Sequence, residues 1–150
     1  MEDSQSTCSQ LNGCLFFSSG KLARVIGRTA DDAFKITGLS PSHAFLLHIV
    51  NHGSGIHQKI VGEMLHMTPS TITRFVEKLE NKGLVARQTD GKNVHLFTTE
   101  KGLALQPEII KAWESLHDCY SGILTPEESE QFFSIVNKLI CQLEDNKSVQ

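Results

Sequence analysis

Hydrophobic residues recur at helical spacing along most of the 150-residue chain. Residues 10–36 carry apolar positions four and seven apart, which predicts one long first helix that ends at Gly38. Ser40-Pro41 then supplies an N-cap and a first-turn proline for a second helix over about 41–52. The N-terminal third of the chain is therefore predicted to be a pair of helices.

Two shorter helices follow after a glycine-rich turn at 53–55. One covers residues 57–66, and the other covers 69–81 with Thr68 as its N-cap and Gly83 as its stop. The predicted buried faces are Ile60, Val61, Met64 and Leu65 in the first and Ile72, Phe75, Val76 and Leu79 in the second. A break of three residues, 66–68, separates these helices, as in a helix-turn-helix.

The spacing of apolar residues then changes from helical to alternating. Residues 84–88 and 93–97 are predicted to be two strands joined by 89–92, where Asp90-Gly91 favours a tight turn because glycine tolerates a positive φ. The pattern predicts a β-hairpin directly after the helix-turn-helix.

Two further helices complete the prediction. The fifth starts at Thr98 or Thr99 and kinks at Pro107, and the sixth starts at Thr125. Their predicted inward residues are Ile109, Ile110, Trp113, Leu116 and Tyr120 in the fifth and Phe132, Val136, Leu139, Ile140 and Leu143 in the sixth. The expected fold is mainly α with a small β-hairpin, organised as a single domain over 1–150.

Charge is distributed unevenly along the chain, whose net charge is −3. Residues 53–99 hold six cations and four anions, whereas the flanking residues hold eight cations and thirteen anions. A mildly basic centre between acidic flanks suits a nucleic-acid-reading module held by helices with another task.

Composition narrows the class further. The acidic, polar start MEDSQSTCSQ lacks the features of a secretory signal, and no apolar run approaches a membrane span, so a cytoplasmic location is expected. The four cysteines form no Cys-x-x-Cys pair, which argues against a zinc ribbon or a disulfide framework. Phosphate-binding, zinc-protease and nucleophile-elbow motifs are absent, so neither an enzyme nor a cofactor is expected.

The second helix of the helix-turn-helix has the dimensions to enter a DNA major groove. Its hydroxyl side chains can reach phosphates or base edges, and Arg74 can bind guanine or a phosphate. The candidate DNA-contacting residues are Pro69, Ser70, Thr71, Thr73, Arg74 and Lys78 in this helix and Arg87, Lys92 and Asn93 in the hairpin. In the plainer interpretation, Thr68 and Ser70 only cap the helix and Arg74 pairs with Glu77.

Residues 56–87, IHQKIVGEMLHMTPSTITRFVEKLENKGLVAR, resemble the multiple-antibiotic-resistance (MarR-type) winged helix-turn-helix regulators. The resemblance continues through Thr98-x-x-Lys101-Gly102 and through residues 124–128. It implies a homodimer formed by helices at 10–38 and 100–146, with a DNA-binding lobe at 41–99. It also implies binding to a double-stranded, pseudo-palindromic operator, usually as a repressor released by a small molecule or by oxidation.

One feature departs from the family pattern. The family's hairpin loop carries an Asp-Arg pair whose arginine enters the minor groove, whereas the loop here, residues 89–93, is about four residues shorter and has no arginine. Lys92 remains as a phosphate contact. The alternative function is a winged-helix dimer that binds a protein partner or a ligand without specific DNA binding.

Three kinds of signal compete as the switch. An apolar or aromatic effector could contact Phe16, Phe17, Phe34, Phe45 and Trp113, although these residues are also ordinary core candidates. Cys14 lies near the position of the reactive cysteine in the peroxide-sensing branch of the family, but the surrounding tyrosines are missing. His48 and His52 have a spacing that can share a metal ion, yet no carboxylate completes a set, so no metal site is expected.

Overall fold

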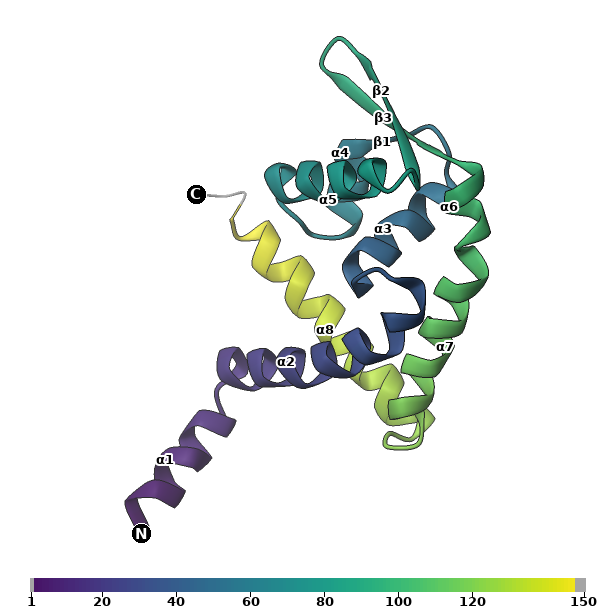
Figure 1. Cartoon of the computed structure of the whole chain (residues 1–150). Coiled ribbons are helices and arrows are strands. Elements are labelled where there is room, and N and C mark those ends of the chain that lie inside the picture. Colours follow the sequence, from purple (N-terminus) through teal and green to yellow (C-terminus); the bar gives the residue numbers. More distant parts are fainter. Residues whose placement is uncertain (1, 148–150) are drawn as a thin grey trace. The chain divides into compact units, whose positions relative to one another are not determined.

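The computed structural model describes residues 2–147, and helices make up most of them (Figure 1). In chain order the elements are α1 (Glu2–Asn12), α2 (Leu15–Phe34), the 3₁₀ turn η1 (Lys35–Thr37), α3 (Pro41–His52), β1 (Ile56–His57), α4 (Gln58–Met64), α5 (Pro69–Asn81), β2 (Val85–Asp90), β3 (Asn93–Thr98), α6 (Glu100–Ala104), α7 (Gln106–Ser121) and α8 (Pro126–Asp145). The chain divides into two compact units within α7, one ending at Ser115 and the other beginning at Leu116.

The prediction of one unbroken first helix over 10–36 is wrong. A helix already covers Glu2–Asn12, and the chain breaks at Gly13-Cys14, where Cys14 has the extended conformation of an N-cap residue (φ −88°, ψ 121°) before α2. The Ser18 hydroxyl donates to the carbonyl of Asn12 at 2.7 Å and so satisfies a group at the end of α1. The apolar residues keep their helical spacing on both sides of the glycine, so the spacing alone does not reveal that the helix is interrupted there.

The predicted capping residues are confirmed for the next helices. Gly38 adopts a left-handed conformation (φ 68°) after η1, and the Ser40 side chain caps α3 by accepting from the backbone N–H of His43. Thr68 caps α5 in the same way, and Gly83 follows α5 with φ 71°. His57 fills the N-cap position of α4, where its ring accepts from the N–H of Lys59 at 3.1 Å.

The apolar face predicted for α4 is only partly correct. Val61 is buried completely, whereas Ile60 and Met64 are 47% and 58% exposed. The helix is only seven residues long, so one short face is covered, and Ile60 and Met64 stay exposed in the part of the chain that the structure describes. The largest fully buried side chains of the first unit come from α2, α3, α4, α5, β3 and α7: Phe34, Leu46, Leu47, Val50, Val61, Ile72, Val76, Leu79, Leu96 and Ile109.

The hairpin carries a third strand that the sequence did not reveal. The sheet has the order β1-β3-β2 with both pairs antiparallel, and the two-residue β1 pairs Ile56 with Leu96. Strands β2 and β3 extend to Asp90 and from Asn93, so the loop is shorter than the predicted 89–92. Gly91 takes the first loop position with φ 60°, a backbone conformation that favours glycine. We call residues 85–98, the β2–β3 hairpin, the wing.

The predicted fifth helix is two helices, α6 and α7, which meet just before Pro107 as expected for a proline that cannot continue the hydrogen-bond ladder. Thr99 rather than Thr98 is the N-cap of α6. Of the five inward residues predicted for α7, Ile109 and Leu116 are buried, whereas Ile110 and Trp113 are 38% and 40% exposed.

The second unit contains the end of α7 and all of α8. Thr125 is the N-cap of α8, as predicted, with Pro126 in the first turn, and its side chain and that of Glu128 form a reciprocal capping box. No residue of α8 is buried; of its predicted apolar face, Val136 and Leu139 are half-buried and the other three residues are exposed. Among the described residues, no helix has the length and apolar character needed to cross a membrane.

Candidate nucleic-acid interface

Helix α5 is held by one buried face. Ile72, Val76 and Leu79 are buried and spaced three and four residues apart, so they fix the rotation of the helix about its axis. Thr68 and Pro69 fix its start, because the Thr68 hydroxyl accepts from the N–H of Thr71 and proline is pre-organised for the first turn. The opposite face is therefore displayed in a defined orientation.

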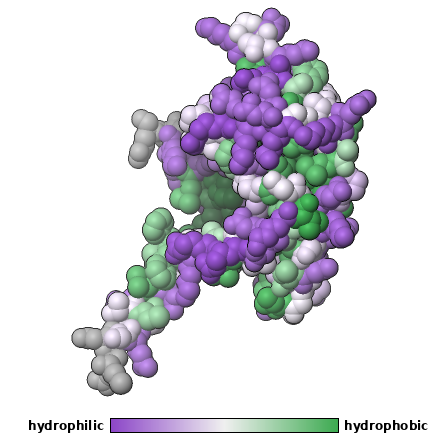
Figure 2. Space-filling model, viewed as in Figure 1, coloured by the Kyte–Doolittle hydropathy of each residue, from purple (hydrophilic) through white to green (hydrophobic). Residues whose placement is uncertain are grey.

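The displayed face of α5 is polar and cationic. Ser70, Arg74 and Lys78 follow one another at spacings of four residues, and all three are exposed. Arg74 and Lys78 form no ion pair in the part of the chain that the structure describes, so the alternative pairing of Arg74 with Glu77 is not observed. Hydrophilic side chains dominate the visible surface around α5 and the wing (Figure 2).

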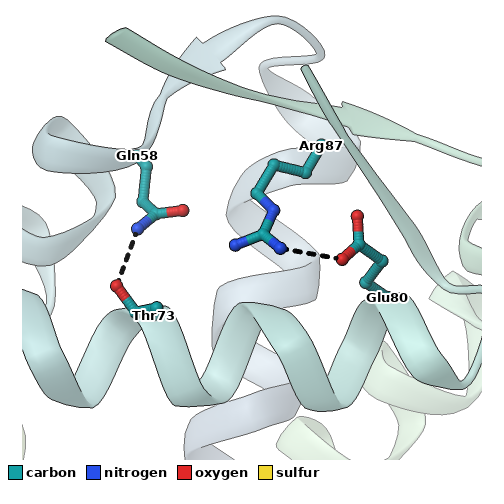
Figure 3. Close-up of polar contacts among 4 residues, drawn as sticks. All are labelled: Gln58, Thr73, Glu80 and Arg87. Carbon is teal, nitrogen blue, oxygen red and sulfur yellow. Dashed lines mark hydrogen bonds and ion pairs between the residues drawn. The ribbon is translucent and has the colours of Figure 1, made fainter. Parts of the chain in front are cut away.

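All three predicted hydroxyl residues of α5 already form hydrogen bonds within the protein, and the Ser70 hydroxyl lies 3.3 Å from that of Thr68. Thr73 accepts a hydrogen bond from Gln58 Nε2 at 3.2 Å and donates to the carbonyl of Pro69 at 2.9 Å (Figure 3). The hydroxyls of Thr71 and Thr68 lie 2.9 Å apart and share a hydrogen bond. Thr73 therefore fixes α5 against α4, while Pro69 and Ser70 remain exposed at the start of the helix.

Gln58 is a positioning residue that was not predicted as part of the site. Because Thr73 already donates to Pro69, its oxygen can only accept from Gln58, and this fixes which amide atom faces Thr73. The other atom, Gln58 Oε1, is buried without a hydrogen-bond partner in the described structure.

Arg87 holds the base of the wing against the end of α5. Its guanidinium lies 3.2 Å from the carboxylate of Glu80, and both side chains are about one-third exposed (29% and 36%) (Figure 3). Arg87 was predicted as a DNA contact. In the structure its charge is shared with Glu80, so a structural role accounts for its position.

The wing presents little cationic surface. Lys92 occupies the second position of the two-residue loop and is exposed, and Asn93 begins β3. The Asn93 side chain lies 3.2 Å from His57 Nε2, and the rings of His57 and His95 are 5.2 Å apart on paired strands. Asn93 is thus linked to the N-cap of α4 rather than held free at the tip.

His43 joins α3 to α5. Its ring stacks on Phe75 with the ring centres 4.0 Å apart, and its Nδ1 lies 2.5 Å from the Ser40 hydroxyl. Burial lowers the pKa of His43, and the positive charges of Lys78 and Lys82 lower it further. The neutral ring is therefore favoured at the back of the cationic face.

The aromatic residues proposed as effector contacts are only partly brought together. Phe45 packs edge-on against both Phe34 and Trp113, with ring centres 5.2 and 4.9 Å apart. Phe16 is 89% exposed and Phe17 is half-buried, and neither ring packs against this group in the described residues. Within the packed group of Phe34, Phe45 and Trp113, Phe34 is fully buried, so Phe45 and Trp113 are its accessible members.

The proposed redox and metal residues are also located. Cys14 is exposed as a free thiol at the N-cap position of α2. The rings of His48 and His52 lie 4.2 Å apart, and His48 Nδ1 lies 2.7 Å from the side-chain nitrogen of Gln106. Burial, followed by the charge of His52, lowers the pKa of His48. No group of three or more metal-ligating side chains is found in the described part of the chain.

Comparisons with known proteins agree with this geometry. The family model described as MarR family matches residues 39–93. The uncharacterized HTH-type transcriptional regulator YybA of Bacillus subtilis is 26% identical over 123 residues, covering 80% of this chain and 82% of its own. The HTH-type transcriptional repressor MdtR of the same organism is 27% identical over 105 residues, covering 68% of each chain. The crystal structure of the S. aureus MepR–DNA complex superimposes with a TM-score of 0.77 at 18% identity, covering 87% of this chain and 98% of that one.

Proposed function

We propose that the chain is a winged-helix, DNA-binding transcriptional regulator of the MarR family, and that it represses transcription as a homodimer bound to a pseudo-palindromic operator. Its relatives and structural neighbours are regulators, which supports a regulatory rather than an enzymatic role. Release by a small molecule or by oxidation, and action in the cytoplasm, belong to the same proposal. MdtR, a relative, is itself named a repressor.

The free cations of α5 carry the DNA part of this proposal. Arg74 and Lys78 are exposed on the face opposite the buried stripe and are not neutralised by a carboxylate among the described residues. A cation without an internal partner is available for phosphate or guanine, and it gives up no ion pair on binding. Bound in this way, α5 lies in the major groove.

Exposed apolar side chains support the homodimer. In the first unit, Leu22, Val25 and Ile26 of α2 are 41–46% exposed, and in the second unit Phe133, Ile135 and Leu143 of α8 are 54–58% exposed. Apolar surface on this scale usually marks an interface, and a twofold dimer buries the same patch on both subunits. A dimer would place its two α5 helices on half-sites about one helical turn, roughly 34 Å, apart.

Two features support a signal-dependent release. Phe45 and Trp113 offer partly open aromatic rings for an apolar effector. The exposed Cys14 thiol is accessible to an oxidant. Loss of operator binding on addition of peroxide, prevented by Cys14→Ser, would support oxidation, whereas unchanged binding would leave a small molecule as the signal.

Fluorescence anisotropy tests DNA binding. The purified protein is titrated with its own upstream DNA, and with a random-sequence pool, at two salt concentrations. We expect tight, salt-sensitive binding, and we expect Arg74→Ala to weaken it by about 1–3 kcal/mol. Lys111→Ala is the matched control, since Lys111 is an exposed lysine of α7 outside the site.

Absence of binding above non-specific background at low salt, to either DNA, would refute the DNA proposal. The alternative, binding to a protein partner or a ligand, is favoured by the short wing, whose loop has no arginine. Binding that depends only weakly on salt would favour this alternative, because phosphate contacts release counterions and most protein interfaces do not.

A further inference from the structure

The turn between α4 and α5 contains the one non-glycine residue of the described chain that has a positive φ. His66 has φ 50°, whereas the other described positions with a positive φ are Gly38, Gly55, Gly83 and Gly91. A residue with a Cβ is strained in this left-handed region, and glycine is not. Histidine therefore stands where the chain elsewhere uses glycine, and where the turn of a helix-turn-helix often contains glycine too.

The hydrogen bonds at the end of α4 require this left-handed conformation. The N–H of Met67 donates to the carbonyl of Gly62 at 3.0 Å, and the N–H of His66 donates to the carbonyl of Glu63 at 3.2 Å. Together these two bonds form a Schellman motif, in which the residue at the position of His66 is usually glycine. The backbone angle of His66 is therefore set by the end of the helix, and a glycine would adopt it without steric cost.

His66 lies directly before the start of α5. Thr68, the N-cap of α5, follows two residues later, and His66, Pro69 and Ser70 are all exposed. When a helix-turn-helix binds DNA, the N-terminal residues of its second helix contact base edges and its first helix crosses the sugar-phosphate backbone. A side chain in the turn between these two helices is then close to a phosphate.

We propose that His66 is a further DNA-binding residue, whose imidazole ring donates a hydrogen bond to a backbone phosphate at the edge of the major groove. This inference rests on the proposed function, because the phosphate belongs to the DNA in which α5 lies. Residues in strained backbone conformations cluster at functional sites, and the imidazole supplies an N–H donor that glycine lacks. A phosphate contact carries no sequence information. His66 therefore raises the affinity for any DNA sequence and does not select the operator.

The substitution His66→Gly tests the proposal, because it should move stability and DNA affinity in opposite directions. Removal of the Cβ relieves the backbone strain and should raise Tm by about 2–4 °C. Removal of the ring should weaken DNA binding by about twofold to tenfold for each subunit that contacts DNA, as for one lost hydrogen bond. The loss should be equal on the protein's own upstream DNA and on random-sequence DNA. A purely structural role would change Tm and leave the affinity of the folded protein unaltered.

Two matched variants complete the experiment. Arginine keeps a Cβ in the left-handed region and supplies a permanent charge for the phosphate. His66→Arg should therefore not raise Tm, should bind DNA at least as tightly as the parent protein, and should bind with a steeper dependence on salt. His117 is an exposed histidine of α7 in the second unit, so His117→Gln should leave DNA affinity unchanged.

Fluorescence anisotropy with both DNAs measures affinity, and thermal unfolding at one fixed protein concentration measures Tm. An affinity of His66→Gly equal to that of the parent protein would overturn this proposal and leave the DNA proposal standing. A lower Tm in His66→Gly would overturn it too, because the histidine would then stabilise the turn. Weakening on the upstream DNA alone would place the ring at a base edge and overturn the phosphate contact. Absence of DNA binding by the parent protein would refute both proposals, so their failures are distinguishable.

Discussion

Gly102 allows α6 to approach the turn after α5 more closely than any side chain would permit. A Cβ placed on Gly102 would lie 2.1 Å from the carbonyl oxygen of Leu84 and 3.2 Å from Leu47 Cδ1. An ordinary carbon–oxygen contact is about 1 Å longer than the first of these distances. The substitution Gly102→Ala therefore requires α6 and the start of β2 to move apart, because the atom in the way belongs to the backbone.

Two effects of opposite sign set the magnitude. Overpacking a filled site costs about 1–3 kcal/mol, and here the cost lies near the upper end because no flexible side chain can yield. Alanine recovers at most about 1 kcal/mol through its helix propensity, and less in the short α6. We expect a net destabilisation of about 2 kcal/mol. For a chain of this size that lowers Tm by about 4–8 °C.

Urea and thermal unfolding at one fixed protein concentration measure this change. Gly27→Ala in the middle of α2 is the matched control, since a Cβ there meets nothing within 4 Å. It should stabilise the protein by about 0.5–1 kcal/mol, so the two glycine substitutions should shift Tm in opposite directions. If Gly102→Ala proves as stable as the parent protein, the close approach is not a steric constraint and the reasoning fails.

Three further predictions concern local contacts. Thr68→Ala should lower the free energy of unfolding by about 1 kcal/mol in urea and Thr68→Ser should restore it, unless the cap does not stabilise α5. The lowered pKa of His43 means that the unfolded chain takes up a proton more readily. Stability should therefore be full above the ordinary value of 6.5 and fall as pH drops below it, with a shallower fall in His43→Gln; equal slopes would contradict this. A double-mutant cycle of Arg87→Met and Glu80→Gln should give a coupling below about 1 kcal/mol, since the pair is partly exposed, and a larger value would mean that water is excluded there.

Elements with local chemical signals were predictable from the sequence. Ser40, Thr68 and Thr125 each precede a proline, and that pairing located the starts of α3, α5 and α8. Asp90-Gly91 located the hairpin in the same way, because the turn requires a positive φ that few residues other than glycine adopt. Signals of this kind depend on neighbouring residues only.

Features that depend on distant partners were not predictable. The strand β1 exists because Ile56 pairs with Leu96, forty residues away, and two residues carry no periodicity of their own. The Thr73 hydroxyl is hydrogen-bonded to Gln58 in another helix, and the Arg87 guanidinium is paired with Glu80. Apolar residues such as Ile60 fit a helical stripe equally well whether or not a neighbour covers them.

In the proposed DNA complex, the two-residue loop of the wing limits how many base pairs the protein can read. A side chain in the minor groove distinguishes A·T from G·C and senses groove width, which extends the code beyond the major-groove positions. Without an arginine at the wing tip, the readable positions in the proposed complex would lie beneath α5, and the operator would carry less information. Since a genome presents roughly 10⁶–10⁹ competing sites, a shorter code leaves more promoters of nearly equal affinity. Which genes respond would then depend on the number of regulator molecules in the cell as much as on any one operator.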